Sequence, residues 1–238
     1  MKTTKTIKTL VVLAASAGMM FTSRTKSSGP SSSSLGVKIQ ATNKTFSVLK
    51  SAALSAPGFV WDTCFINVSK IEFEAEKRES ESSKDSANVN FEWTGPKIVD
   101  LFNVSSVIGN IGLQPGLYGE VSLKIEALKS DAGTSPVFYL SGVYNDSTGV
   151  SVPVVVIINE DIEFNVSKEG TELNGTIDYT SLINLNLTLL LNGIGQSALS
   201  GATLTNGKIV ISSTSNTSLY DKIKVNFDSS DEAEFNEN

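Results

Sequence analysis

Apolar and polar side chains alternate most regularly between Leu117 and Ala127. One face of this stretch is expected to carry the apolar side chains Leu117, Val121, Leu123, Ile125 and Ala127. The other face is expected to carry Tyr118, Glu120, Ser122, Lys124 and Glu126. A period of two residues is typical of a half-buried antiparallel strand. The preceding Gln114–Leu117 predicts a type II turn, because proline and glycine suit its two central positions.

A longer apolar-polar pattern runs from Phe59 to Glu76 and changes phase near Ser69 and Lys70. One extra residue at a β-bulge produces such a change, so we expect a long strand with a bulge there. The charged, serine-rich residues 77–86 predict a solvated hairpin loop, after which residues 88–93 return as a strand. Residues 97–102 form a further short apolar run that is typical of a strand.

Most other apolar runs of the chain are also short and strand-like. They are residues 35–41, 46–54, 136–142, 150–158, 162–166, 177–187 and 208–212. Leu219, Ile223 and Phe227 recur at intervals of four instead, which predicts a short amphipathic helix over Ser218–Phe227 with Ser218 as its cap. We expect an all-β protein: one antiparallel β-sandwich, immunoglobulin- or transthyretin-like, over residues 35–238, with a short C-terminal helix and a frayed acidic tail over residues 228–238.

The first residues have the pattern of an export signal. Three lysines precede the apolar run Leu10–Phe21, which is too short to span a bilayer but has the length of a signal peptide core. We assign residues 1–23 to a signal peptide and 24–34 to a Ser/Gly/Pro-rich linker. Arg24 stands where a lipoprotein would carry the acylated cysteine, so we expect free export rather than membrane anchoring.

Charge and composition narrow the range of partners. Residues 27–238 carry 14 basic and 25 acidic side chains, a net charge of −11. Such a surface repels nucleic acid and anionic lipid, so neither is an expected partner. Cys64 is the single cysteine, which excludes an internal disulfide framework, and its apolar neighbours predict a buried, inert thiol.

The residue types present exclude most catalytic systems. The chain contains no histidine, which rules out Ser-His-Asp and Cys-His nucleophiles and most catalytic zinc sites. Glu72, Glu74 and Glu76 alternate with apolar residues, so we place them on the outer, solvated face of a strand rather than in a glycosidase site. We therefore expect no enzyme activity and no organic cofactor.

Two kinds of binding site remain as candidates. Calcium prefers clustered oxygen ligands, and the turns around Asp146 and around Glu160-Asp161 provide them, although plain turn chemistry explains both turns too. Tyr118, Tyr144 and Asp146 are the candidates for glycan binding, because aromatic rings beside turns can stack on sugars. Their alternative role is in the packing of neighbouring strands.

The segments "FINVSKIEFEA", "VDLFNV" and "LQPGLYGEVSLKIEA" resemble a family of bacterial envelope proteins catalogued as domain of unknown function 4382. The resemblance covers about residues 59–191. It implies an exported, often lipid-anchored β-sandwich, and it supplies no catalytic residues.

These observations predict a non-catalytic, exported bacterial envelope domain that binds a glycan or a surface protein. It would lie in the periplasm, on the outer-membrane surface or outside the cell. The alternative is a structural subunit of a surface or pilus-like assembly, which passes a strand between copies. Residues 150–158 are the strand expected to do so.

Overall fold

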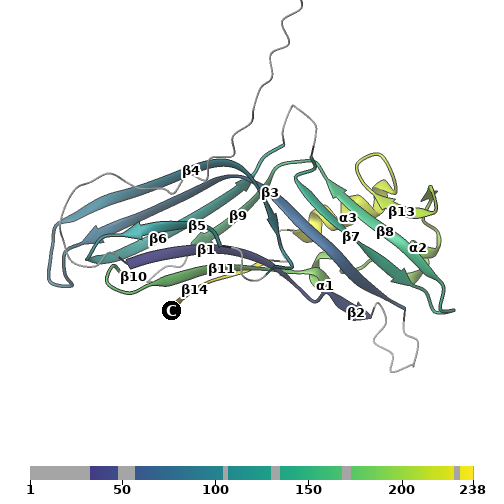
Figure 1. Ribbon diagram of the computed structural model, residues 1–238, viewed down its shortest axis with the longest axis horizontal. Helices are drawn as coiled ribbons and strands as arrows, with labels where there is room; N and C mark the ends of the chain where they lie inside the picture. Colours follow the sequence, from purple (N-terminus) through teal and green to yellow (C-terminus); the bar gives the residue numbers. More distant parts are fainter. Residues whose placement is uncertain are drawn as a thin grey trace, which may run out of the picture.

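One strand, β3 (Gly58–Arg78), runs along most of the length of the molecule (Figure 1). The computed structural model describes residues 33–47, 57–103, 107–129, 135–167, 173–227 and 231–237, and for 231–234 the backbone alone. The expected signal peptide, residues 1–23, lies outside this range, as does nearly all of the expected linker, residues 24–34. None of the helices in the described part is long and apolar enough to cross a membrane.

One edge of β3 pairs with two different strands, one along each half of β3. Residues 58–66 of β3 pair with β7 (Phe138–Asn145), and residues 70–78 pair with β6 (Leu117–Ala127). On the opposite edge, β4 (Ser86–Asp100) pairs with β3, with a register shift between Val68 and Lys70. This shift confirms the predicted bulge near Ser69-Lys70. The predicted strands 88–93 and 97–102 are parts of the single strand β4.

Among the described residues, the larger sheet has ten strands, one of which is β3. Its other members are β2 (Thr45–Ser47), β8 (Ser151–Ile158), β9 (Ile162–Ser167), β10 (Leu173–Asn174), β12 (Leu204–Thr205) and β13 (Lys208–Ile211), together with β4, β6 and β7. β8 and β13 are parallel neighbours, whereas β7 and β8 form an antiparallel hairpin. β8 is therefore paired on both sides over residues 154–156 and is not the free strand expected of an assembly subunit.

The smaller sheet has the order β14-β11-β1-β5 and packs against the half of the larger sheet that contains β6 and β9. It consists of β1 (Ser33–Thr42), β5 (Val107–Leu113), β11 (Tyr179–Asn186) and β14 (Asp231–Glu237). β1 and β11 are parallel over eight residue pairs. The all-β character is confirmed, but the purely antiparallel sandwich is not, since both sheets are mixed. Alternation within a strand does not encode the direction of its neighbour, which explains the error.

The prediction of a frayed acidic tail is also wrong for residues 231–237. Residues 231–237 do not fray but form β14, which pairs antiparallel with β11 at the edge of the smaller sheet. Phe235 packs against the core from this strand. Pairing with β11, rather than any local apolar pattern, makes this acidic segment a strand.

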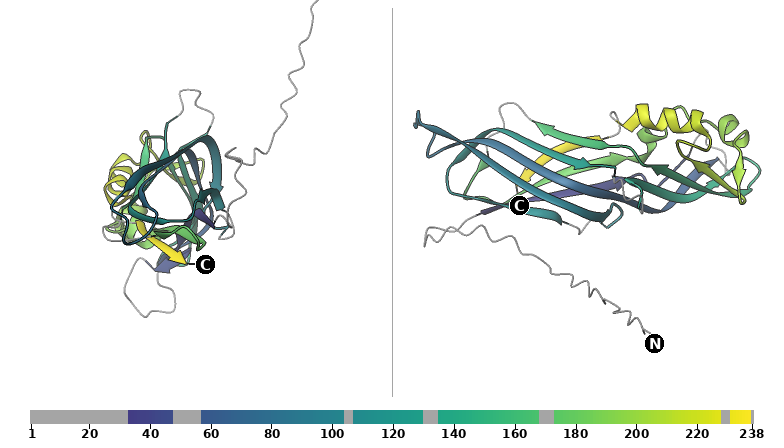
Figure 2. Two further views of the ribbon diagram at one scale, coloured as in Figure 1. Left: turned by 90° about the vertical axis from the view of Figure 1, so that its left-hand side faces the viewer. Right: turned by 90° about the horizontal axis from the view of Figure 1, so that it is seen from above.

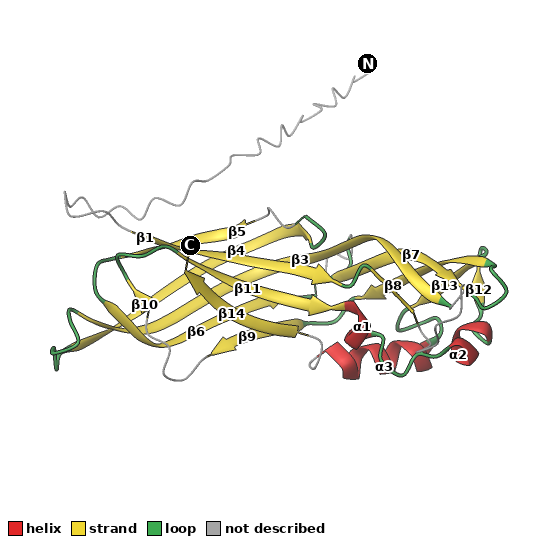
Figure 3. Ribbon diagram, turned by 90° about the horizontal axis from the view of Figure 1, so that it is seen from below, coloured by secondary structure: helices red, strands yellow, loops and turns green. Residues whose placement is uncertain are grey.

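In the part of the chain that the structure describes, three helices cover one side of the β7–β8–β13 half of the large sheet (Figure 3). They are α1 (Leu187–Leu190), α2 (Gln196–Ser200) and α3 (Thr217–Phe227). α3 confirms the predicted amphipathic helix and buries Leu219, Ile223 and Phe227. It begins at Thr217, so Ser218 lies in its first turn rather than at its cap. In a view along the long axis, the strands and helices are arranged around that axis (Figure 2). The buried apolar side chains form one core cluster.

Candidate functional site

Tyr118, the leading candidate for stacking on a sugar, is buried. Its side chain is 1% exposed, and its hydroxyl both accepts from the Gln114 N–H at 2.8 Å and donates to the Gln114 carbonyl at 2.9 Å. The prediction that Tyr118 lies on the polar face is wrong. Glu120 has a φ of +49° and forms a bulge against β3, which moves Tyr118 to the same face as Val121.

Tyr144 and Asp146 have structural roles in the β7–β8 hairpin. Tyr144 is 2% exposed, and its ring lies 5.3 Å from that of Phe59. The Asp146 carboxylate accepts hydrogen bonds from the N–H groups of Thr148 and Val150, both at 2.8 Å, and from the Thr148 hydroxyl. These bonds lower the pKa of Asp146. The geometry is that of a side chain that closes its own turn.

Glu160 and Asp161 lie beyond the other end of β8, so the structure does not bring them together with Asp146. Glu160 pairs with the Lys224 ammonium and accepts a hydrogen bond from the Tyr220 hydroxyl at 3.0 Å; the Lys224 bond contributes most to lowering the pKa of Glu160. Asp161 accepts the backbone N–H of Lys129 at 2.7 Å. Within the described ranges, no group of three or more Asp, Glu, His or Cys side chains could hold a metal ion.

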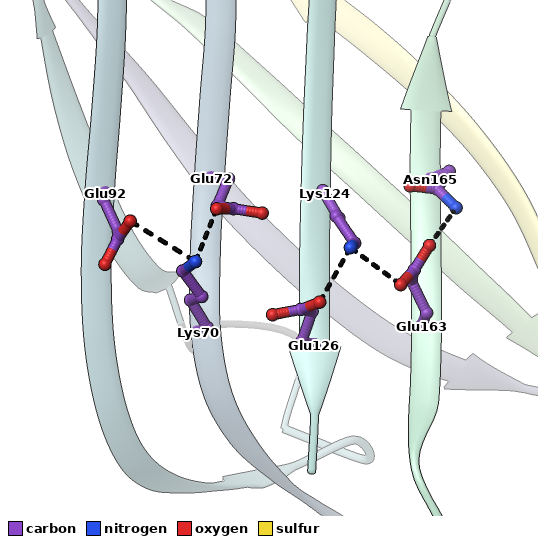
Figure 4. Close-up of polar contacts among 7 residues, drawn as sticks. All are labelled: Lys70, Glu72, Glu92, Lys124, Glu126, Glu163 and Asn165. Atoms are coloured by element: carbon purple, nitrogen blue, oxygen red, sulfur yellow. Dashed lines mark hydrogen bonds and ion pairs between the residues drawn. The ribbon is translucent and has the colours of Figure 1, made fainter.

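The outer face of β4, β3, β6 and β9 carries a ladder of ion pairs (Figure 4). Lys70 on β3 lies 2.5 Å from Glu72 and 3.3 Å from Glu92 on β4. Lys124 on β6 lies 2.7 Å from Glu126 and 2.8 Å from Glu163 on β9. This arrangement confirms that Glu72 belongs to a solvated outer face. Hydrogen bonds to carboxylates raise the pKa of both lysines, so both stay charged at neutral pH.

A cleft of about 710 Å³ opens where the pairing partner of β3 changes from β7 to β6. β7 pairs with β3 only as far as Ile66, and β6 only from Lys70 onward. Between these points, the N–H of Asn67 donates to the Val137 carbonyl, and the Ser69 hydroxyl accepts from the N–H of Leu128 at 3.0 Å. The cleft therefore lies at the point where β7 and β6 diverge along the same edge of β3, which we call the fork.

The walls of this cleft, which we call the fork cleft, combine apolar and polar groups. Ile98 is 60% exposed and Leu128 is 41% exposed, and Pro96 lies beside them. Lys70 and Lys129 also line the cleft. Exposed apolar side chains within a polar rim are the composition of a binding surface.

Asn67 adds an acceptor to the fork cleft. Its side-chain oxygen is buried and has no hydrogen-bond partner among the described residues. A buried oxygen without a partner costs free energy, and a donor from a bound molecule would recover it. None of the described residues that line the cleft carries a carboxylate or a thiol.

The sequence pattern predicts one of the two features that form the fork cleft. The phase change at Ser69-Lys70 locates the bulge, but it does not reveal that β3 changes neighbours there. Trp93 and Tyr139 are not among the described residues that line the cleft: Trp93 packs against the core, and Tyr139 stacks on Phe65 with ring centroids 4.9 Å apart.

Comparison with protein-family models, with curated proteins and with solved structures found no match to this chain. The resemblance to the bacterial envelope family therefore rests on the sequence segments alone.

Proposed function

We propose that the protein is an exported, non-catalytic domain of the bacterial cell envelope that binds a surface protein through the fork cleft. The observation that carries this proposal is the exposure of Ile98 and Leu128 beside the unpartnered oxygen of Asn67. Together they offer a bound segment both apolar contact and a hydrogen-bond acceptor.

A protein segment fits the fork cleft better than a glycan does. Sugar recognition depends strongly on aromatic rings that stack on the pyranose face, and none of the described residues that line the cleft is aromatic. Tyr118 and Tyr144, the expected stacking residues, are buried elsewhere. Lys129 favours a partner segment that carries a carboxylate near its apolar side chains, whereas Lys70 is already paired with Glu72 and Glu92.

Binding of immobilised full chain to envelope proteins and, separately, to purified envelope glycans tests the proposal. We expect the wild type to retain a protein and Ile98→Lys to lose it, because a lysine would place a charge in the apolar contact. Val225→Lys is the matched control, since Val225 is 76% exposed on α3 and lies outside the cleft. Retention of glycan alone, or equal retention by Ile98→Lys, would contradict the proposal.

A further inference from the structure

Strand β8 is apolar on both faces, although the described structure covers one of them. Its inner residues Val154 and Val156 are 0% exposed and belong to the core. Val155 and Ile157 point to the other side and are only half-buried. An uninterrupted apolar run such as residues 152–158 is typical of a strand that is covered on both sides.

The outer apolar residues of neighbouring strands are adjacent to those of β8. Phe65 pairs with Tyr139, and Tyr139 pairs with Ile157, in one row across β3, β7 and β8. In the next rows Val155 pairs with Val210, and Val143 pairs with Pro153. We call the surface formed by Phe65, Tyr139, Val143, Val155, Ile157 and Val210 the apolar face.

The apolar face is open. The three helices lie on the other side of β7, β8 and β13, and no described element lies over the apolar face (Figure 3). None of its six residues packs against the core. The outer face of the same sheet over β4, β6 and β9 carries instead the ladder of Lys70, Lys124 and their carboxylate partners (Figure 4). One sheet therefore has a polar outer half and an apolar outer half.

Charge indicates which molecule covers the apolar face. β7 and β8 contain no charged residue, so two copies can approach there without the repulsion expected between chains whose residues 27–238 carry −11. Two charged residues stand on opposite borders of this face. Asp62 on β3 accepts a hydrogen bond from the outward Ser141 hydroxyl at 3.0 Å, and Lys208 lies two residues before Val210 on β13.

These borders are complementary under a twofold axis. A rotation about an axis parallel to the strands places β3 of one copy over β13 of the other. Asp62 then faces Lys208 of the second copy, and the contact occurs twice because the interface is symmetric. Face-to-face packing of two β-branched sheet surfaces is the arrangement found in β-sandwiches. We infer that a second copy of this chain packs on the apolar face, which shares no residue with the described lining of the fork cleft.

Sedimentation of the full chain over a range of concentrations tests this inference. We expect a reversible dimer that Val155→Lys weakens by about 100-fold, because two lysines would be buried without partners. Val225→Lys makes the same change on an exposed helical site and should leave the dimer intact. A wild type that stays monomeric at about 1 mM, or a dimer that Val155→Lys does not weaken, would overturn the inference.

A charge exchange tests the twofold arrangement. Asp62→Lys and Lys208→Asp alone should each weaken the dimer by about 10-fold, because each brings like charges together. The double variant should return to within about 3-fold of the wild type, because the pair is restored in reverse. Additive losses in the double variant would contradict the arrangement. Circular dichroism of every variant confirms that a loss of dimer is not a loss of fold.

Discussion

Lys124 on β6 lies 2.8 Å from Glu163 on β9, and its other partner, Glu126, precedes the end of its own strand by one residue. The contact links two strands that are adjacent in the sheet but 39 positions apart in the chain at these residues. The Lys124 ammonium and the Asn165 amide lower the pKa of Glu163. The pair should therefore make stability depend on pH in a defined direction.

Glu163→Gln should lower stability slightly at neutral pH, by an amount typical of exposed ion pairs. A carboxylate whose pKa is lowered on folding stabilises the fold above its unfolded pKa, and this contribution is lost as the pH falls through the folded value. The difference in urea midpoint between wild type and Glu163→Gln should therefore shrink below about pH 4. Glu74→Gln, at an exposed site on the same face, is the matched control, and equal trends in the two variants would contradict the pair's role.

Tyr118→Phe should destabilise the fold by about 1–2 kcal/mol, because the Gln114 N–H and carbonyl would lose their partner near the core. Chemical denaturation measures this loss. Tyr139→Phe is the control, since the Tyr139 ring is half-buried on the outer face, and it should change stability by less than about 0.5 kcal/mol. Equal effects would show that Tyr118 does not have the bonded, interior position described above.

Gly142→Ala should destabilise the protein by more than about 3 kcal/mol or prevent folding. An added Cβ would lie 2.2 Å from the Val60 carbonyl oxygen and 2.7 Å from the Trp61 Cα, both backbone atoms that cannot move aside independently. Gly112→Ala is the matched control, because a Cβ there meets no atom within 4 Å. Thermal unfolding compares the two variants. If Gly142→Ala leaves stability unchanged, β3 and β7 lie further apart than in this structure.

Cys64 should not react with thiol reagents while the protein is folded. Its side chain is 0% exposed, and burial, together with the nearby negative charge of Asp100, raises the pKa of its thiol. Labelling by a chromogenic disulfide should begin only as urea unfolds the chain. Val225→Cys adds a thiol at an exposed site and should react at once, which shows that the reagent is active. Rapid labelling of Cys64 in the native protein would indicate an open core.

The spacing of apolar residues correctly predicted the strands and the helix whose buried face is set by that spacing. The alternation over residues 162–166 predicted β9, and the spacing of Leu219, Ile223 and Phe227 predicted α3. The long strand with its bulge at Ser69-Lys70 was also predicted correctly. In each case the side chains that form the core face are those that set the period.

The wrong or missing predictions concern features that depend on pairing with a distant segment or on a single backbone angle. Glu120 adopts a left-handed conformation that alternation does not reveal, and this angle turns Tyr118 inward. β14 is acidic and becomes a strand because β11 offers it an edge. The fork cleft could not be predicted, because it depends on β6 and β7 sharing one edge of β3.

Site-specific photo-crosslinking in cells that produce the full chain tests whether the fork cleft binds an envelope protein. A photoreactive residue in place of Ile98 should form a covalent adduct with an envelope protein, because the exposed wall of the fork cleft would contact it. The same residue in place of Val225, on α3, should form none. No adduct at position 98, or adducts of equal yield at both positions, would contradict the fork cleft as the binding site.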